Sequence, residues 1–271
     1  MKYVEPFKDF FINEDKLYPK DNLNKSIKSF EVRIKNKQKN LNRHPRPLSS
    51  DFIDNYQIQD GEFDKIKRIL ERDCSKFINE IKSEDLLFRG MKKLPDNTYN
   101  NINGIWLKQA RKNRSPIDID TDIDNHFNIF SKEKFGIPLR KQGVFATKDP
   151  LIAKGFSDHL KTQRPYIFFP IGDYKYFWNP EITDLYNYLE DQEWYNDFES
   201  EKRLEDINFY DYHKKRAKSD GYDPMDEIKH IVQNYKQGGL SEVKTHELTF
   251  ILDKYYVIHQ KYYFKIKEWL P

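Results

Sequence analysis

Apolar residues in the first third of the chain recur at helical spacing. A short run at 52–58 follows Ser49, Ser50 and Asp51, which together form a good N-terminal cap. A stronger run follows, with apolar side chains three and four positions apart at Phe63, Ile66, Ile69, Leu70, Cys74, Phe77, Ile78 and Ile81. This spacing places the apolar residues on one face and predicts a helix that ends at 83–85.

The pattern changes after residue 84, where short apolar and aromatic runs predict strands. These runs lie at 85–90, 142–147, 166–171, 174–178, 246–251 and 255–263. Helices are expected between them, one capped at 118–121 and ending near 136, one starting at 149–150, and a mostly helical stretch to about 235. We therefore expect an α+β protein, with a helical N-terminal region over 1–84 and a mixed β core of short strands over 85–271.

Composition supports a folded chain once its aromatic residues are considered. Only 37% of the residues are hydrophobic and 34% are charged, values that on their own favour disorder. The chain also contains 20 Phe, 18 Tyr and 4 Trp residues, whereas disordered chains are poor in aromatic residues. We therefore expect an aromatic-rich core beneath a charged surface.

The sequence indicates a cytoplasmic protein without a membrane partner. Cys74 is the single cysteine, which excludes a disulfide framework and a cysteine-based zinc site and is typical of a reducing compartment. Residues 1–11 include Glu5 and Asp9 and lack the apolar centre of a signal peptide. No stretch approaches the roughly 20 apolar residues that a membrane span requires.

Charge is distributed unevenly along the chain. The net charge of +3 is too close to neutral to indicate a nucleic-acid or membrane partner by itself. Residues 24–46 are largely basic or polar, and residues 181–206 are rich in acidic side chains. Either segment is a solvated face or a surface that orients a charged partner.

Several function classes lack their motifs. The seven histidines are scattered and none lies in an H-E-x-x-H frame. Neither a P-loop nor a dinucleotide-fold glycine motif is present, and no nucleophile elbow is visible. P-loop ATP hydrolysis and nicotinamide redox chemistry on a dinucleotide fold are therefore disfavoured.

Three short segments carry candidate chemistry. Arg89 ends an apolar run beside Gly90, and its planar guanidinium suits a phosphate group. Thr147 places a hydroxyl at the end of the run 143–147, just before a predicted helix. Glu247 places a carboxylate at the head of an apolar run, where it is a surface residue or an acid with a shifted pKa.

This order of motifs resembles the arginine–serine–glutamate class of mono-ADP-ribosyltransferases. That class typically shows a Tyr- or Phe-Arg-Gly element, a Ser-Thr-Ser-like element and a glutamate. The first element corresponds to 88–90, the second to 145–147 with its hydroxyls reduced to one, and the third to Glu247. The resemblance covers roughly residues 85–265. The segments 142–147 and 169–180 are also similar to segments of uncharacterised bacteriophage proteins.

The resemblance implies an ADP-ribosyltransferase-like domain over 85–271 that uses NAD as substrate and needs no metal. Glu247 would stabilise the positive charge that develops on the ribose when nicotinamide leaves. Arg89 would bind the diphosphate, and Thr147 would orient the nicotinamide ribose or Glu247 itself. The acceptor would be a host macromolecule, protein or nucleic acid, in the cytoplasm of the host.

The resemblance also suggests contacts for the nicotinamide. Gly90 would let backbone groups reach the carboxamide, and Phe145 or Phe156 would stack on the ring. Members that modify arginine carry a second acid two residues before the glutamate. Thr245 stands at that position here, and the upstream acid Glu242 is too far away to replace it. Arginine is therefore a disfavoured acceptor.

Each candidate also has a structural interpretation. Arg89 would pair with Asp85 or another structural acid, Thr147 would cap a helix, and Glu247 would be an exposed residue at a strand start. The basic loop 111–114 is a solvated loop or a phosphate contact. These interpretations lead to an alternative function, a non-catalytic binding or virion-associated protein that keeps the fold. Binding of single-stranded nucleic acid is a third hypothesis, which the small net charge disfavours.

Overall fold

A computed structural model describes residues 61–92, 101–102, 104–116, 119–155 and 163–271. The chain divides into two compact units, Met1–Asn42 and Arg43–Pro271, and all described residues belong to the second. The helix predicted at 52–58 and the basic segment 24–46 lie outside the described residues.

Helices and strands alternate along the described chain. The α-helices are α3 (Glu62–Asp73), α4 (Ser75–Glu80), α5 (Thr121–Phe135), α6 (Leu139–Gln142), α7 (Pro150–Gly155), α8 (Leu185–Glu190), α9 (Glu193–Glu205), α10 (Phe209–Asp220), α11 (Pro224–Asn234) and α12 (Tyr263–Trp269). Three 3₁₀ turns are η2 (Ser83–Asp85), η3 (Leu240–Glu242) and η4 (Gln260–Tyr262). The strands are β1 (Phe88–Lys92), β2 (Asn101–Ile102), β3 (Ile105–Gln109), β4 (Val144–Ala146), β5 (Gln163–Pro170), β6 (Lys175–Trp178), β7 (Lys236–Gln237), β8 (Leu248–Ile251) and β9 (Lys254–Ile258).

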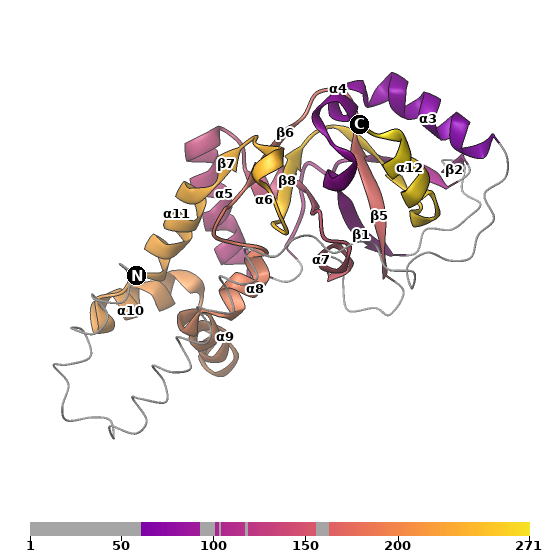
Figure 1. Cartoon of the computed structure of the whole chain (residues 1–271). Coiled ribbons are helices and arrows are strands. Elements are labelled where there is room, and N and C mark those ends of the chain that lie inside the picture. The colour runs from indigo at the N-terminus through magenta and orange to yellow at the C-terminus, as the bar shows by residue number, and fades with distance from the viewer. Residues whose placement is uncertain (1–60, 93–100, 103, 117–118, 156–162) are drawn as a thin grey trace, which may run out of the picture. The chain divides into compact units, whose positions relative to one another are not determined.

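The strands form two antiparallel sheets, which confirms the expected α+β class. One sheet has the order β1-β5-β9-β3-β2 and the other the order β4-β8-β6-β7. Figure 1 shows β1 and β5 in the first sheet and β6 and β8 in the second. The sheets are joined where Phe88 of β1 forms a bridge with Thr147, the residue that follows β4.

Local signals in the sequence explain where α5 begins and ends. The carboxylate of Asp120 accepts hydrogen bonds from the backbone N–H groups of Asp122 (2.8 Å) and Ile123 (3.4 Å), which caps α5. Gly136 ends α5 with φ 74°, a left-handed conformation that favours glycine. Both ends of this helix are where the sequence predicted them.

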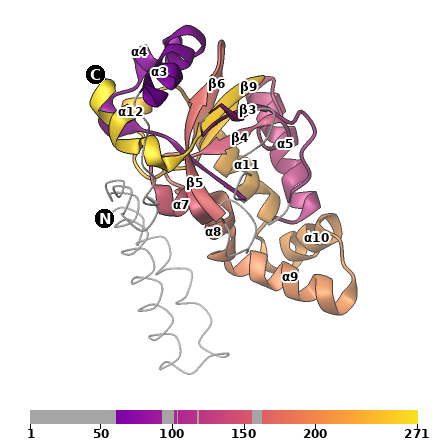
Figure 2. The same ribbon diagram turned by 90° about the vertical axis from the view of Figure 1, so that its right-hand side faces the viewer.

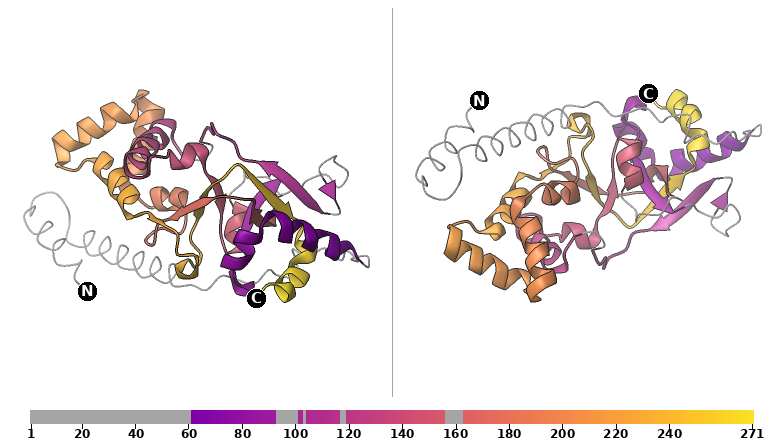
Figure 3. Two further views of the ribbon diagram at one scale, coloured as in Figure 1. Left: turned by 90° about the horizontal axis from the view of Figure 1, so that it is seen from above. Right: turned by 90° about the horizontal axis from the view of Figure 1, so that it is seen from below.

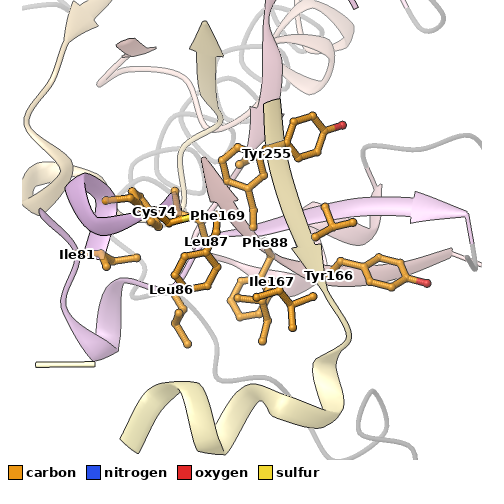
Figure 4. Packing of buried hydrophobic residues seen from close by; sticks show 14 of the residues in the cluster. Cys74, Ile81, Leu86, Leu87, Phe88, Tyr166, Ile167, Phe169 and Tyr255 are labelled. Atoms are coloured by element: carbon orange, nitrogen blue, oxygen red, sulfur yellow. The ribbon is translucent and has the colours of Figure 1, made fainter. Parts of the chain in front are cut away.

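Helices α3, α4 and α12 share a hydrophobic core with the five-stranded sheet. Figures 1 and 3 show these helices grouped beside β1 and β5, away from α8–α11. Figure 4 shows Cys74 and Ile81 from the helical segment beside Leu87, Phe88 and Phe169 from the sheet side of this core. The described part of the predicted helical region, 61–84, therefore packs into the same core as the β strands.

A second core lies among α5 and α8–α11. Its fully buried members include Phe177, Phe198, Phe209 and Tyr212. Figure 2 shows α9 and α10 at one end of this helical group, with α11 between them and the strands. Helices α8–α11 form the stretch between β6 and β7, which the sequence predicted as mostly helical.

Two expectations about individual elements are corrected. The helix predicted over 63–81 is divided at Cys74 into α3 and α4. The strand predicted over 255–263 ends at Ile258, and the chain continues into η4 and α12. Across the described ranges, every helix is too short or too polar to cross a bilayer.

Candidate active site

The three segments that carry candidate chemistry meet where the two sheets join. Phe88 of β1 exchanges two backbone hydrogen bonds with Thr147, with N···O distances of 2.7 and 3.0 Å. β4 pairs antiparallel with β8, and continuing their register by one residue sets Thr147 opposite Glu247. Arg89, Thr147 and Glu247 are therefore carried by three neighbouring strands.

Glu247 lies just before β8 in a buried position. Its backbone N–H donates to the carbonyl of Thr183 (2.7 Å), and the residue is only 8% exposed. Its Oε1 atom has no hydrogen-bond partner among the described residues. Nη1 of Arg140 lies 3.9 Å from this oxygen, within ion-pair range but beyond a hydrogen bond. An unsatisfied buried carboxylate oxygen is costly and marks a candidate functional position.

The surroundings of Glu247 shift its protonation equilibrium. The pKa of this carboxyl is raised to about 8, chiefly by burial and then by the nearby Asp184 carboxylate. Arg140, Arg114 and Arg89 oppose this shift because their positive charges favour the carboxylate. Glu247 therefore holds its proton at neutral pH until another positive charge approaches it.

Arg89 and Arg114 flank the carboxyl from two other elements. Nη1 of Arg89 donates to the carbonyl of Phe145 (2.6 Å), and its guanidinium carbon lies 5.6 Å from the ring centroid of Tyr255. Nη1 of Arg114 donates to the carbonyl of Gly143 (2.8 Å). Within the described part of the chain, neither arginine has a carboxylate ion-pair partner.

Two of the arginines lie against the ring of Phe145, and Arg89 donates to the backbone carbonyl of the same residue. The guanidinium carbons of Arg114 and Arg140 lie 4.5 and 5.1 Å from the ring centroid of Phe145. The pKa of Arg114 is lowered to about 10, chiefly by burial and then by the charges of Arg89 and Arg140. Such a cluster is suited to an anionic group with several oxygen acceptors, such as a phosphate or diphosphate.

Thr147 is placed beside Glu247 but faces the protein interior. The residue is fully buried, and its hydroxyl donates to the carbonyl of Thr245 (3.2 Å). The same oxygen accepts from the backbone N–H of Asp149 (3.2 Å). Thr147 therefore connects the end of β4 to the segment that leads into Glu247. The cap of α7 is Asp149, whose carboxylate accepts from two N–H groups in the first turn of that helix.

Gly90, Phe145 and Phe156 are the residues expected to contact the nicotinamide. A Cβ atom at Gly90 would lie 1.7 Å from the carbonyl oxygen of Ala153, so the glycine permits α7 to approach β1 closely. Figure 2 shows α7 beside the strands of this sheet. Phe145 is 8% exposed and contacts the arginine side chains with its ring. Phe156 lies outside the described residues.

Three of the structural interpretations are wrong. Thr147 does not cap a helix, because the carboxylate of Asp149 caps α7. Asp85 forms its ion pair with the buried amine of Lys148, so it does not hold Arg89. Glu247 is buried, so it is not an exposed residue at a strand start.

Sequence reasoning missed three charged members of the site and placed a fourth in an open loop. Arg140, Asp124 and Asp184 were not singled out, and the basic loop left Arg114 as a solvated residue or a phosphate contact. Arg140 stands three residues before the run 143–147, which is the one signal that pointed to it. Asp184 is brought to Glu247 by tertiary structure alone.

No family model, no curated protein and no solved structure matches this chain. Among the residues that the structure describes, no group of three or more His, Cys, Asp or Glu side chains is arranged to hold a metal ion.

Proposed function

We propose that the protein is an ADP-ribosyltransferase that moves ADP-ribose from NAD to a macromolecule. The observation that carries this proposal is the buried Glu247 carboxyl, whose unpartnered oxygen lies among Arg89, Arg114 and Arg140. The strands that bear Arg89, Thr147 and Glu247 are neighbours, in agreement with the motif order that suggested the class.

The chemistry assigns Glu247 to the bond that breaks. The bond between nicotinamide and C1′ of its ribose breaks, both bonding electrons leave with nicotinamide, and the positive charge on C1′ is shared with the ring oxygen. An ionised carboxylate beside the ribose stabilises this cation. A nucleophilic atom of the acceptor then bonds to C1′ and loses its proton to solvent.

Substrate binding would prepare Glu247 for this role. The nicotinamide ring of NAD carries a positive charge, and a nearby positive charge favours the carboxylate form of a carboxylic acid. A carboxyl with a pKa of about 8 therefore ionises when the substrate arrives. The ring of Phe145 contacts the guanidinium groups of Arg114 and Arg140 and would hold them in place.

Arg89 and Arg114 would bind the diphosphate. Each donates one N–H group to a backbone carbonyl, and each lacks a carboxylate partner within the described ranges. Charge-assisted hydrogen bonds from arginine are the contacts that hold phosphate oxygens most strongly. Thr245 stands where arginine-modifying enzymes of the class carry a second acid, so we expect an acceptor group other than a guanidinium.

Transfer of a labelled ADP-ribose group tests the proposal. Biotin-labelled NAD is incubated with bacterial lysate and either the wild type, Glu247→Gln, or the exposed control Glu242→Gln. We expect label on macromolecules with the wild type and the control, and none with Glu247→Gln. Sensitivity of the label to protease or nuclease identifies the acceptor class. Equal labelling by all three proteins would reject the role of Glu247.

The buried hydroxyl of Thr147 favours a second candidate. This hydroxyl is used by two backbone groups, so it does not reach a substrate. A non-catalytic protein that binds NAD or another phosphate-bearing ligand through the arginines would need no such hydroxyl. Calorimetry distinguishes the two, because this candidate predicts saturable ligand binding without release of nicotinamide.

A further inference from the structure

Asp124 on α5 and Arg140 on α6 form a buried ion pair close to Glu247. Nε of Arg140 donates to Oδ1 of Asp124 (2.7 Å), and the two side chains are 14% and 6% exposed. The other oxygen of Asp124 accepts from the side-chain amide of Asn128 (2.9 Å). The position of the guanidinium is therefore set by a carboxylate that is itself held in place.

The backbone of Arg140 is fixed by the same helix. The side-chain carbonyl of Asn128 accepts from the backbone N–H groups of Arg140 and Lys141, each at 3.0 Å. The hydroxyl oxygen of Ser131 accepts from the N–H of Leu139 (3.0 Å). These bonds satisfy the first N–H groups of the short helix α6 and attach it to α5. The backbone N–H and the side-chain Nε of Arg140 are thus both bonded to residues of α5.

The remaining end of the guanidinium points to Glu247. Nη1 of Arg140 lies 3.9 Å from Oε1 of Glu247, and this oxygen has no hydrogen-bond partner among the described residues. At this distance the charge acts on the carboxyl without occupying its lone pairs. Within the described ranges the oxygen is therefore left without a hydrogen bond, although it is buried from solvent.

We propose that Arg140, held by Asp124, is a positioning residue that keeps Glu247 able to ionise without forming a hydrogen bond to its carboxylate oxygen. The electrostatic part of this inference concerns the chain itself, and its consequence for catalysis rests on the proposed function. A purely structural ion pair between α5 and α6 would hold these helices together with no effect on the titration of Glu247.

Among the described residues, four charged groups act on Glu247, and they set the sign of the expected change. Asp184, just before α8, favours the protonated carboxyl, as does burial. Arg140 on α6, Arg114 after β3 and Arg89 on β1 favour the carboxylate. The phenol of Tyr235, after α11, has its own pKa raised by burial and by Glu247. Removing the charge of Arg140 leaves burial and Asp184 less opposed, so the pKa of Glu247 rises.

Carbon-13 NMR of the glutamate side-chain carboxyls measures this titration without NAD. The Glu247 resonance is assigned by its loss in Glu247→Gln. We compare the wild type with Arg140→Gln, which loses the charge but keeps an amide for Asp124, and with Arg140→Lys, which keeps the charge. The matched control is Lys202→Met, which breaks another ion pair of this helical region, that between Lys202 and Asp120.

We expect the Glu247 midpoint of Arg140→Gln to lie at least about one pH unit above that of the wild type, a tenfold change in the ionisation constant. The Glu247 midpoints of Arg140→Lys and Lys202→Met should lie within about half a pH unit of the wild-type midpoint. Nicotinamide release by Arg140→Gln should show the same displacement of its acidic limb, with a KM for NAD close to that of the wild type.

An unshifted midpoint in Arg140→Gln overturns the inference. If that variant does not fold, Arg140→Lys decides, because a shift of a unit or more with the charge retained contradicts the charge-based account. Failure of the proposed function is recognised separately. A wild type that releases no nicotinamide refutes the activity, whereas the titration still reports whether Arg140 controls Glu247.

Discussion

Replacing Glu247 by glutamine should stabilise the folded protein as the pH rises. The folded state raises the pKa of this carboxyl from 4.5 to about 8, chiefly through burial. Between these values the folded protein binds a proton that the unfolded chain has lost. The contribution of Glu247 to the stability is therefore greatest below pH 4.5. It falls as the pH rises, until the folded carboxyl also ionises near pH 8.

The size of this effect follows from the two pKa values. Each pKa unit corresponds to about 1.4 kcal/mol, so the wild type loses on the order of 4 kcal/mol between pH 5 and pH 9 through this group. Glutamine at position 247 does not titrate and escapes this loss. The buried amide of the glutamine would lack a hydrogen-bond partner. This lowers the stability of the variant by about 1–3 kcal/mol at every pH.

Urea denaturation of both proteins at intervals between pH 5 and pH 9 measures the difference. All other titrating groups are shared, so the difference between the unfolding free energies isolates Glu247. We expect the unfolding free energy of Glu247→Gln to rise relative to that of the wild type as the pH increases. This difference should level off above pH 8. The Glu242→Gln variant, which removes an exposed carboxylate, is the control. A difference for Glu247→Gln that is constant over this range would refute the account of the buried carboxyl.

Two further changes test the packing and the charge of the site. Gly90→Ala places a Cβ 1.7 Å from the backbone oxygen of Ala153, so we expect a loss of about 2 kcal/mol or more in urea denaturation. Gly136→Ala meets no atom within 4 Å and is strained only by its φ of 74°, so it should lose about 1 kcal/mol; equal losses would contradict the close approach of α7. Arg114→Met should weaken calorimetric binding of ADP-ribose by about tenfold or more, whereas the exposed Lys112→Met should not. Unchanged affinity in Arg114→Met would remove this arginine from the ligand site.

Local signals in the sequence predicted the helix α5 correctly. Asp120 supplies the N-terminal cap and Gly136 the left-handed C-terminal residue, and both act within a few residues of where they stand. The run 255–263 shows the opposite case. Its aromatic and β-branched residues favour a strand, but the strand ends at Ile258 and the remaining residues enter η4 and α12. Aromatic side chains pack equally well from either element, so composition alone does not locate that boundary.

Candidate site residues were predictable where they belong to a motif. Arg89 and Glu247 were singled out because each stands at an end of an apolar run, and the structure brings both to the join between the sheets. Arg140 and Asp184 belong to no such pattern. They reach Glu247 through the packing of α6 on α5 and through the chain that leads into α8, and both contacts are set by tertiary structure.

Gly90 shows how one residue type serves different needs. Glycine after an arginine indicated a contact with ligand, yet Gly90 lies inside β1 with α7 against it. The sequence identifies the position as one that tolerates no side chain, and only the fold shows that a helix is the reason.

The most direct test of the central claim is the release of nicotinamide from NAD by purified protein, quantified for the wild type beside Glu247→Gln and Glu242→Gln. The account predicts release by the wild type and by Glu242→Gln, and a fall of about a hundredfold or more in Glu247→Gln, the size expected when a group that stabilises developing charge is removed. All three proteins should be shown to be folded in the same buffer. No release by folded wild type, or equal release by wild type and Glu247→Gln, would contradict it.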